Sequence, residues 1–177
     1  PLVVPIPPGA STQARRSARF LTAVHYVDSL LGQVLDDLRR RKLLERTVVI
    51  VTSDHGMEFD ENGLGFAGHG TAFSELQMHT PLVVRWPGRP PERIVHRTSH
   101  NDLAPTLVTE VFGCANPPSD YSSGHGLFSG AQWDWLIGAS YEDFALIEPD
   151  RVTVVFPSGY EIRDRNSFLY LLDGAFD

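Results

Sequence analysis

The sequence has 177 residues, of which 42% are apolar, and a formal net charge of −7 at pH 7. Its length and apolar content suffice for a globular domain, and its negative charge excludes the basic surface typical of nucleic-acid binding. The single cysteine, Cys114, excludes an intramolecular disulfide and does not identify a redox compartment.

The sequence begins at Pro1 and lacks the pattern of a signal peptide. Its apolar runs are shorter than the roughly 18 to 20 residues that a membrane-spanning helix needs. We therefore expect a piece of a longer protein, in which any membrane anchor lies upstream.

A long amphipathic helix is predicted over residues 17–41. Its apolar residues alternate in steps of four and three and so share one helical stripe: Phe20, Val24, Val27, Leu31, Val34 and Leu38. The basic run at residues 39–42 is predicted to form the last turn of this helix, because positive side chains interact favourably with the negative end of the helix dipole.

The apolar run at residues 47–51 predicts a strand buried on both faces of a parallel sheet, with the helix before it as a crossover. A long loop rich in glycine and charge follows at residues 57–80, a length that is usual for functional or disordered loops. Residues 82–86 predict a second strand, and Asn101 or Asp102 is expected to cap a helix that ends at Gly113.

Short strands predominate after Pro117-Pro118 and predict an antiparallel subdomain: residues 136–140, 144–148, 152–156 and 160–163. The sequence thus predicts an α/β core over residues 1–116 and an antiparallel subdomain over residues 117–177.

Asp54 and His55 follow the first predicted strand, where doubly wound α/β sheets bind ligands. A carboxylate and an imidazole suit a divalent ion such as Zn or Mn, and Gly56 lets the backbone turn so that both converge. In the alternative interpretation, Asp54 caps the next segment and His55 is a packed structural residue.

Three blocks, TVVIVTSDHGMEFDENGLGFAGHG, HTPLVVRWPG and NDLAPTLVTEVFG, resemble the sulfatase and phosphoethanolamine-transferase branch of the alkaline-phosphatase superfamily. The resemblance covers nearly the whole chain. It implies an α/β fold that is the C-terminal half of an alkaline-phosphatase-like α/β/α sandwich, with a small antiparallel β appendage.

The resemblance also implies a site. Asp54 and His55 would bind a divalent metal (Zn, Mn, Mg or Ca), and His69 would contact the sulfate or phosphate ester and act as a catalytic residue. Alternatively, His69 orders its loop through a hydrogen bond. We expect the other five histidines to be structural.

The family's nucleophile and remaining acidic metal ligand match nothing here and would lie upstream of Pro1, so the 177 residues alone are predicted to be inactive. The family's sulfate-binding lysine, downstream of the DHG block, also has no match, since the only lysine is Lys42. Its absence favours a phospholipid-type or non-catalytic relative over an arylsulfatase.

A second hypothesis is a non-catalytic, lipid-binding regulatory module. The segment CANPPSDYSSGHGLF resembles the periplasmic domain of inner-membrane sulfatase-like proteins that are associated with lipopolysaccharide and anionic lipid. In this hypothesis a surface around Trp133, Trp135 and Arg151 would bind the partner, although the two tryptophans are equally suited to core packing. A serine-hydrolase alternative is set aside because no G-x-S-x-G motif occurs.

Overall fold

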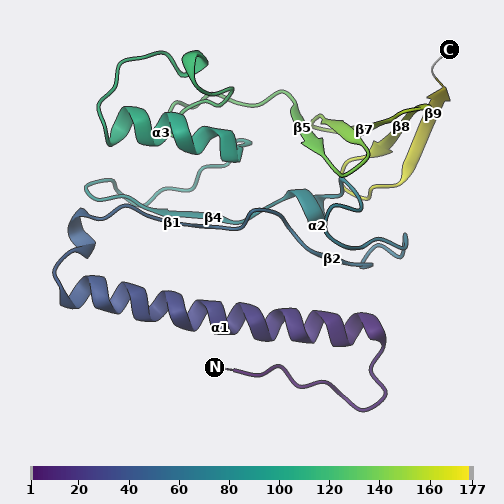
Figure 1. The fold of residues 1–177 in the computed structure, drawn as a ribbon, viewed down its shortest axis with the longest axis horizontal. Coiled ribbons are helices and arrows are strands. Elements are labelled where there is room, and N and C mark those ends of the chain that lie inside the picture. The colour runs from purple at the N-terminus through teal and green to yellow at the C-terminus, as the bar shows by residue number, and fades with distance from the viewer. Residues whose placement is uncertain (1, 176–177) are drawn as a thin grey trace. The chain divides into compact units, whose positions relative to one another are not determined.

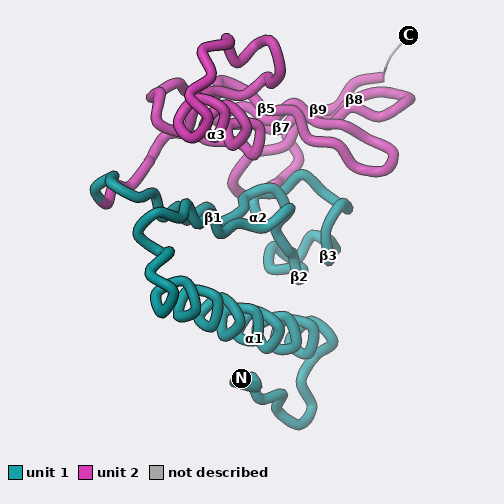
Figure 2. The backbone as a smooth tube through the Cα atoms, turned by 60° about the vertical axis from the view of Figure 1, so that its left-hand side comes forward, with its two compact units in different colours: residues 1–90 teal, residues 91–177 magenta. Residues whose placement is uncertain are grey.

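The computed structural model describes residues 2–175 and divides the chain into two compact units between Pro90 and Pro91 (Figure 2). Its mixture of helices and small antiparallel sheets (Figure 1) agrees with the predicted fold class. The sequence predicted a different kind of boundary, after residue 116, between the α/β core and the antiparallel subdomain. That boundary stays a prediction.

Helix α1 (Thr12–Arg40) confirms the predicted amphipathic helix but begins five residues earlier, because the Ser11 side chain accepts a hydrogen bond from the Ala14 amide at 3.1 Å. The basic residues of its last turn pair with Asp36 and Asp37 of the same helix. Much of its apolar stripe is exposed, for example 61% at Val27. Within residues 2–175, no helix is both long and apolar enough to cross a membrane.

Strands β1 (Val49–Thr52) and β4 (Leu82–Arg85) lie where strands were predicted, but they pair with each other in antiparallel register, Val49 opposite Arg85. The expectation of a parallel sheet is therefore wrong for the strands of the described chain. A parallel pair needs a long crossover, usually a helix. The only helix between these strands is the single-turn α2 (Glu75–Met78), and the chain doubles back instead.

The glycine-rich loop between β1 and β4 is folded. It contains a short hairpin of β2 (Glu58–Phe59) and β3 (Ala67–Gly68), and then α2. The phenyl rings of Phe20 in α1 and Phe59 in β2 lie 5.5 Å apart, which joins the hairpin to the long helix. The short 3-10 helix η1 (Leu44–Arg46) connects α1 to the first strand.

In the second unit, a 3-10 turn η2 (His100–Asp102) leads into α3 (Leu103–Glu110), and a further 3-10 turn η3 (Pro118–Asp120) follows. The predicted cap was Asn101 or Asp102. Asp102 occupies the N-cap position of α3 without a side-chain cap, and Ser99 caps the preceding turn in a capping box with Asp102. The predicted helix is confirmed from Leu103, and it ends at Glu110, before the predicted Gly113.

The rest of this unit is a five-stranded antiparallel sheet in the order β5-β6-β7-β8-β9. Its strands are β5 (Leu136–Ala139), β6 (Phe144–Ile147), β7 (Arg151–Phe156), β8 (Gly159–Asp164) and β9 (Tyr170–Ala175). Ala145 lies opposite Val154 and Ile147 opposite Val152, and all four are buried, so one face of β6 and β7 forms a core. Four strands confirm the prediction, and β9 was not predicted.

Candidate functional site

Asp54 and His55 lie in the turn immediately after β1. The Asp54 Oδ1 accepts a hydrogen bond from the His55 amide at 3.0 Å, and it lies 3.6 Å from the His55 Nε2. The Asp54 side chain is 87% exposed and that of His55 is 38% exposed. The two groups therefore face the same space, and that space is open to solvent.

A neighbouring carbonyl sets the tautomer of the His55 imidazole. Its Nδ1 lies 2.7 Å from the Gly56 carbonyl oxygen, which can only accept, so Nδ1 carries the proton. The Nε2 of a neutral ring then has a free lone pair, and it is the nitrogen nearer to Asp54. Metal-binding histidines commonly donate their other N–H in this way.

His69 packs against His55. The two rings stack with their centroids 3.9 Å apart and their planes 19° apart. The β2–β3 pairing explains this contact, because Glu58 lies opposite Gly68 and the chain that leaves β3 returns to the turn after His55. The structure thus brings together the three residues that the resemblance singled out, Asp54, His55 and His69.

Two residues that the sequence analysis missed hold these segments together. Gln77 is 2% exposed, and its backbone oxygen accepts a hydrogen bond from the Gly56 amide at 2.7 Å. Its side-chain oxygen accepts from the Thr71 and Ala72 amides, and its amide nitrogen donates to Glu58, which is fully buried.

A sequence signal for Gln77 does exist, although it indicates a different role. Ser74 and Gln77 have the spacing of a capping box, Ser-x-x-Gln. In the structure, Ser74 makes no side-chain cap and instead donates to Glu58 Oε2 at 2.6 Å.

The donors present fit a divalent metal in part. Asp54 offers carboxylate oxygens and His55 a free imidazole nitrogen, which are ligand types that Zn and Mn accept. Within residues 2–175, no group of three or more His, Cys, Asp or Glu side chains is arranged to hold a metal ion. A complete site would therefore need ligands beyond the described residues.

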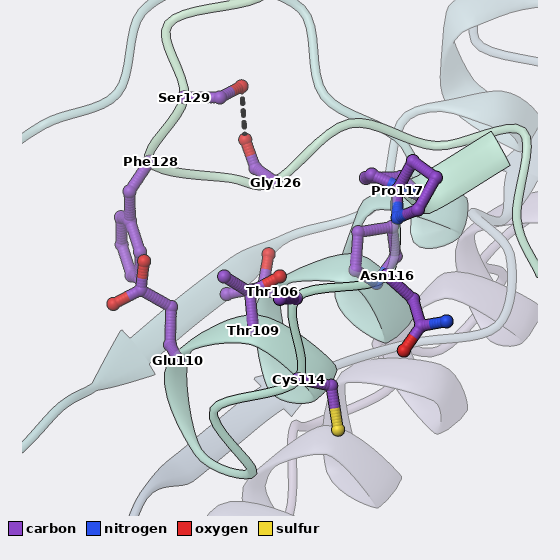
Figure 3. Close-up of a pocket in the computed structure, with 12 residues that line it drawn as sticks. Thr106, Thr109, Glu110, Cys114, Asn116, Pro117, Gly126, Phe128 and Ser129 are labelled. Carbon is purple, nitrogen blue, oxygen red and sulfur yellow. Dashed lines mark hydrogen bonds between the residues drawn. The ribbon is translucent and has the colours of Figure 1, made fainter. Parts of the chain in front are cut away.

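A pocket of about 390 Å³ lies in the second unit, between α3 and the segment around Pro117 and Phe128 (Figure 3). Thr106, Thr109 and Glu110 reach it from the helix, and Cys114 lies at its side. None of Asp54, His55 and His69 lines it, so this pocket is separate from the candidate site.

The tryptophans of the proposed lipid surface differ from each other. The Trp133 indole nitrogen donates to both oxygens of the buried Asp102, at 3.1 and 3.0 Å, and its ring lies 4.9 Å from that of His125. Trp133 therefore has a structural role, because its indole is bonded to the buried Asp102. Trp135 is 50% exposed, and Arg151 pairs with Glu148 at 2.8 Å.

Comparison with known proteins gives consistent matches. The family model described as Sulfatase matches residues 7–111. The "Inner membrane protein YejM" of Salmonella typhimurium is 29% identical over 153 residues, which is 85% of this chain and 25% of that protein. The "Choline-sulfatase" of Rhizobium meliloti is 35% identical over 95 residues, 53% of this chain and 18% of that enzyme.

A solved structure, the phosphonate monoester hydrolase SpPMH from Silicibacter pomeroyi, superposes with a TM-score of 0.72 at 19% identity. The match covers 92% of this chain and 38% of that one, and it shows the shared fold. The chain spans about a quarter of the length of the YejM proteins it matches. Because the family model covers more than half of the chain, these 177 residues belong to the Sulfatase family.

Proposed function

We propose that this chain supplies part of the active site of a metal-dependent hydrolase or transferase that acts on sulfate or phosphate esters. One observation carries the proposal: the free Nε2 of His55 lies 3.6 Å from the Asp54 carboxylate, with the His69 ring stacked on His55. The family match supports the substrate class, since members of this superfamily are generally metal-dependent and the relatives include a choline-sulfatase.

Each residue has a distinct role in this proposal. Asp54 and His55 would hold a divalent ion (Zn, Mn, Mg or Ca) together with ligands from the rest of the full-length protein. A bound ion would stabilise negative charge on the ester oxygens and lower the pKa of the nucleophile. His69 is exposed beside them, where it would donate a hydrogen bond or a proton to an oxygen of the transferred group. The nucleophile would come from outside these 177 residues.

A panel of esters tests this role of His69 in the full-length protein: an aryl sulfate, an aryl phosphate diester and an aryl phosphonate monoester. His69→Ala is expected to lower kcat about 100-fold or more on the accepted ester and to leave the bound metal in place, because general acid catalysis contributes about 10²–10⁴ in rate. His25→Ala, on exposed α1, is the matched control and should retain full activity. Unchanged kcat in His69→Ala would contradict the assignment.

The similarity to YejM supports a second candidate, a periplasmic, membrane-associated module that binds anionic lipid such as lipopolysaccharide. Trp135 and Arg151 are exposed and suit a headgroup interface, whereas Trp133 is bonded to Asp102. In a vesicle-binding assay with lipopolysaccharide, Trp135→Ala combined with Arg151→Ala should weaken binding several-fold. If the double variant binds as the wild type does and the protein turns over an ester, the lipid-binding candidate is contradicted and only the enzymatic role remains.

A further inference from the structure

Gln77 connects the two segments that carry the candidate histidines. Its backbone oxygen holds the Gly56 amide, next to His55, at 2.7 Å. Its side-chain oxygen accepts from the amides of Thr71 at 3.1 Å and Ala72 at 3.2 Å, and these two residues follow the His69 loop. One residue of α2 therefore holds both segments: its backbone oxygen holds the turn after β1, and its side chain holds the return from β3.

Glu58 sets which way the Gln77 amide faces. A carboxylate only accepts hydrogen bonds, so it requires the Gln77 nitrogen, 2.9 Å from Glu58 Oε2, to face it. The Gln77 oxygen must then face the two backbone amides. The Gln77 nitrogen also donates to Thr71 Oγ1 at 3.0 Å, which fixes the same orientation from a second side.

This arrangement is costly for stability. Glu58 is 0% exposed, and within residues 2–175 its Oε1 has no hydrogen-bond partner. Burying a carboxylate with one oxygen unpaired carries a desolvation penalty that an apolar residue of similar volume would avoid. This penalty favours placement of the loops, rather than net stability, as the role of the cluster of Glu58, Ser74 and Gln77.

We propose that Gln77, oriented by Glu58, is a positioning residue that sets the His69 imidazole against that of His55. The inference rests on the proposed ester chemistry, in which His69 touches the transferred group. Neither residue reaches that group in this role, since both act through the backbone of the loops that they hold.

Exchanging the side chains of Glu58 and Gln77 distinguishes a positioning role from a role in packing alone. Gln77→Glu places a second carboxylate beside Glu58 and should displace the His69 loop. In the full-length protein we expect kcat to fall about 100-fold, the loss typical of a misplacement of about 1 Å. KM and bound metal should stay unchanged, because within residues 2–175 the Gln77 side chain makes no hydrogen bond to Asp54 or His55.

Adding Glu58→Gln to Gln77→Glu restores the hydrogen bond between the two side chains, with donor and acceptor exchanged. The introduced amide can donate to the introduced carboxylate, whose other oxygen accepts from Thr71 and Ala72. The double variant should therefore regain most of the lost kcat. Glu58→Gln alone keeps an oxygen that can accept from Gln77 and Ser74, so this single variant should lose little kcat. Gln33→Glu on exposed α1 is the matched control and should change nothing.

A second readout does not depend on activity. In histidine-labelled full-length protein, the 3.9 Å stack predicts nuclear Overhauser contacts between the His55 and His69 rings. These contacts should vanish in Gln77→Glu and return in the double variant. Persistent contacts in Gln77→Glu, or a double variant as impaired as the single one, would overturn the inference. An inactive wild-type protein would refute the proposed function, and the ring contacts would still decide this inference.

Discussion

Gly56 lies where the turn after His55 passes closest to α2. A Cβ atom built at this position would be 2.1 Å from the Leu76 carbonyl oxygen, a backbone atom that cannot move without moving the helix. The sequence predicted that Gly56 lets the chain turn, and in the structure a glycine is also required by the close approach of this turn to α2.

Gly56→Ala is therefore expected to destabilise the protein by about 1–3 kcal/mol, the usual cost of overpacking, and to weaken the candidate site with it. Gly32→Ala is the matched control, because Gly32 is in α1 with open space around it. Alanine in a helix interior should stabilise by about 0.5–1 kcal/mol. Chemical denaturation of both variants measures the difference, and equal effects would contradict the close approach.

The site was predictable from sequence only where residue type carries the chemistry. Asp54 and His55 were proposed as metal ligands because a carboxylate and an imidazole together at a strand end suggest a metal. Gln77 and Glu58 could not be proposed from the sequence, because the role inferred for them rests on a hydrogen bond between residues 19 positions apart. Composition and periodicity do not report such a contact.

Asp102 joins three segments of the second unit. It is 2% exposed, and its carboxylate accepts from the Ser99 amide, the His125 amide and the Trp133 indole. It thereby ties the start of α3 to the long segment before β5.

Asp102→Asn replaces a pure acceptor with a group that also donates, so at least one of these donors loses its partner. We expect a loss of about 1–3 kcal/mol in the free energy of unfolding, as for a buried donor left unsatisfied. Asp134→Asn, at an exposed position nearby, is the control and should change stability by less than about 0.5 kcal/mol. Trp133 fluorescence during denaturation reports both variants.

The turn between β8 and β9 is held by a carboxylate. The Ser167 hydroxyl and amide, and the Asn166 amide, donate to Asp164, and these bonds lower its pKa below the ordinary value of 3.8. A lowered folded-state pKa means that the stabilisation is present above pH 3.8 and is lost as the pH falls through the folded pKa. Amide hydrogen exchange at Ser167 should accelerate in that acid range, beyond its intrinsic pH dependence, and Asp164→Asn should abolish the extra change.

Helices and strands with a clear sequence periodicity were predictable, whereas the pairing of the strands was not. The alternating burial of β7 matches the alternation of polar and apolar residues from Arg151 to Val154. β6 is apolar throughout, and β9 is mostly exposed and forms through backbone pairing with β8. The apolar run of β1 looked like a parallel strand, but strand direction depends on the path of the chain between residues 52 and 82. Residue types do not encode that path locally.

The family assignment accounts for features that the isolated chain leaves unexplained. Val27 and Val34 of α1 are 61% and 55% exposed, and an uncovered apolar stripe on a long helix is what half of an α/β/α sandwich shows. The chain also spans only about a quarter of the YejM proteins. In the proposed function, Asp54 and His55 are the share of the metal ligands that this part of the fold would contribute.

The metal content of the purified full-length protein, measured by elemental analysis after dialysis, tests the central claim most directly. The account predicts a bound divalent ion in the wild type and its loss from Asp54→Ala. Asp28→Ala, on exposed α1, should retain the ion. Equal metal content in the wild type and in Asp54→Ala would contradict the account.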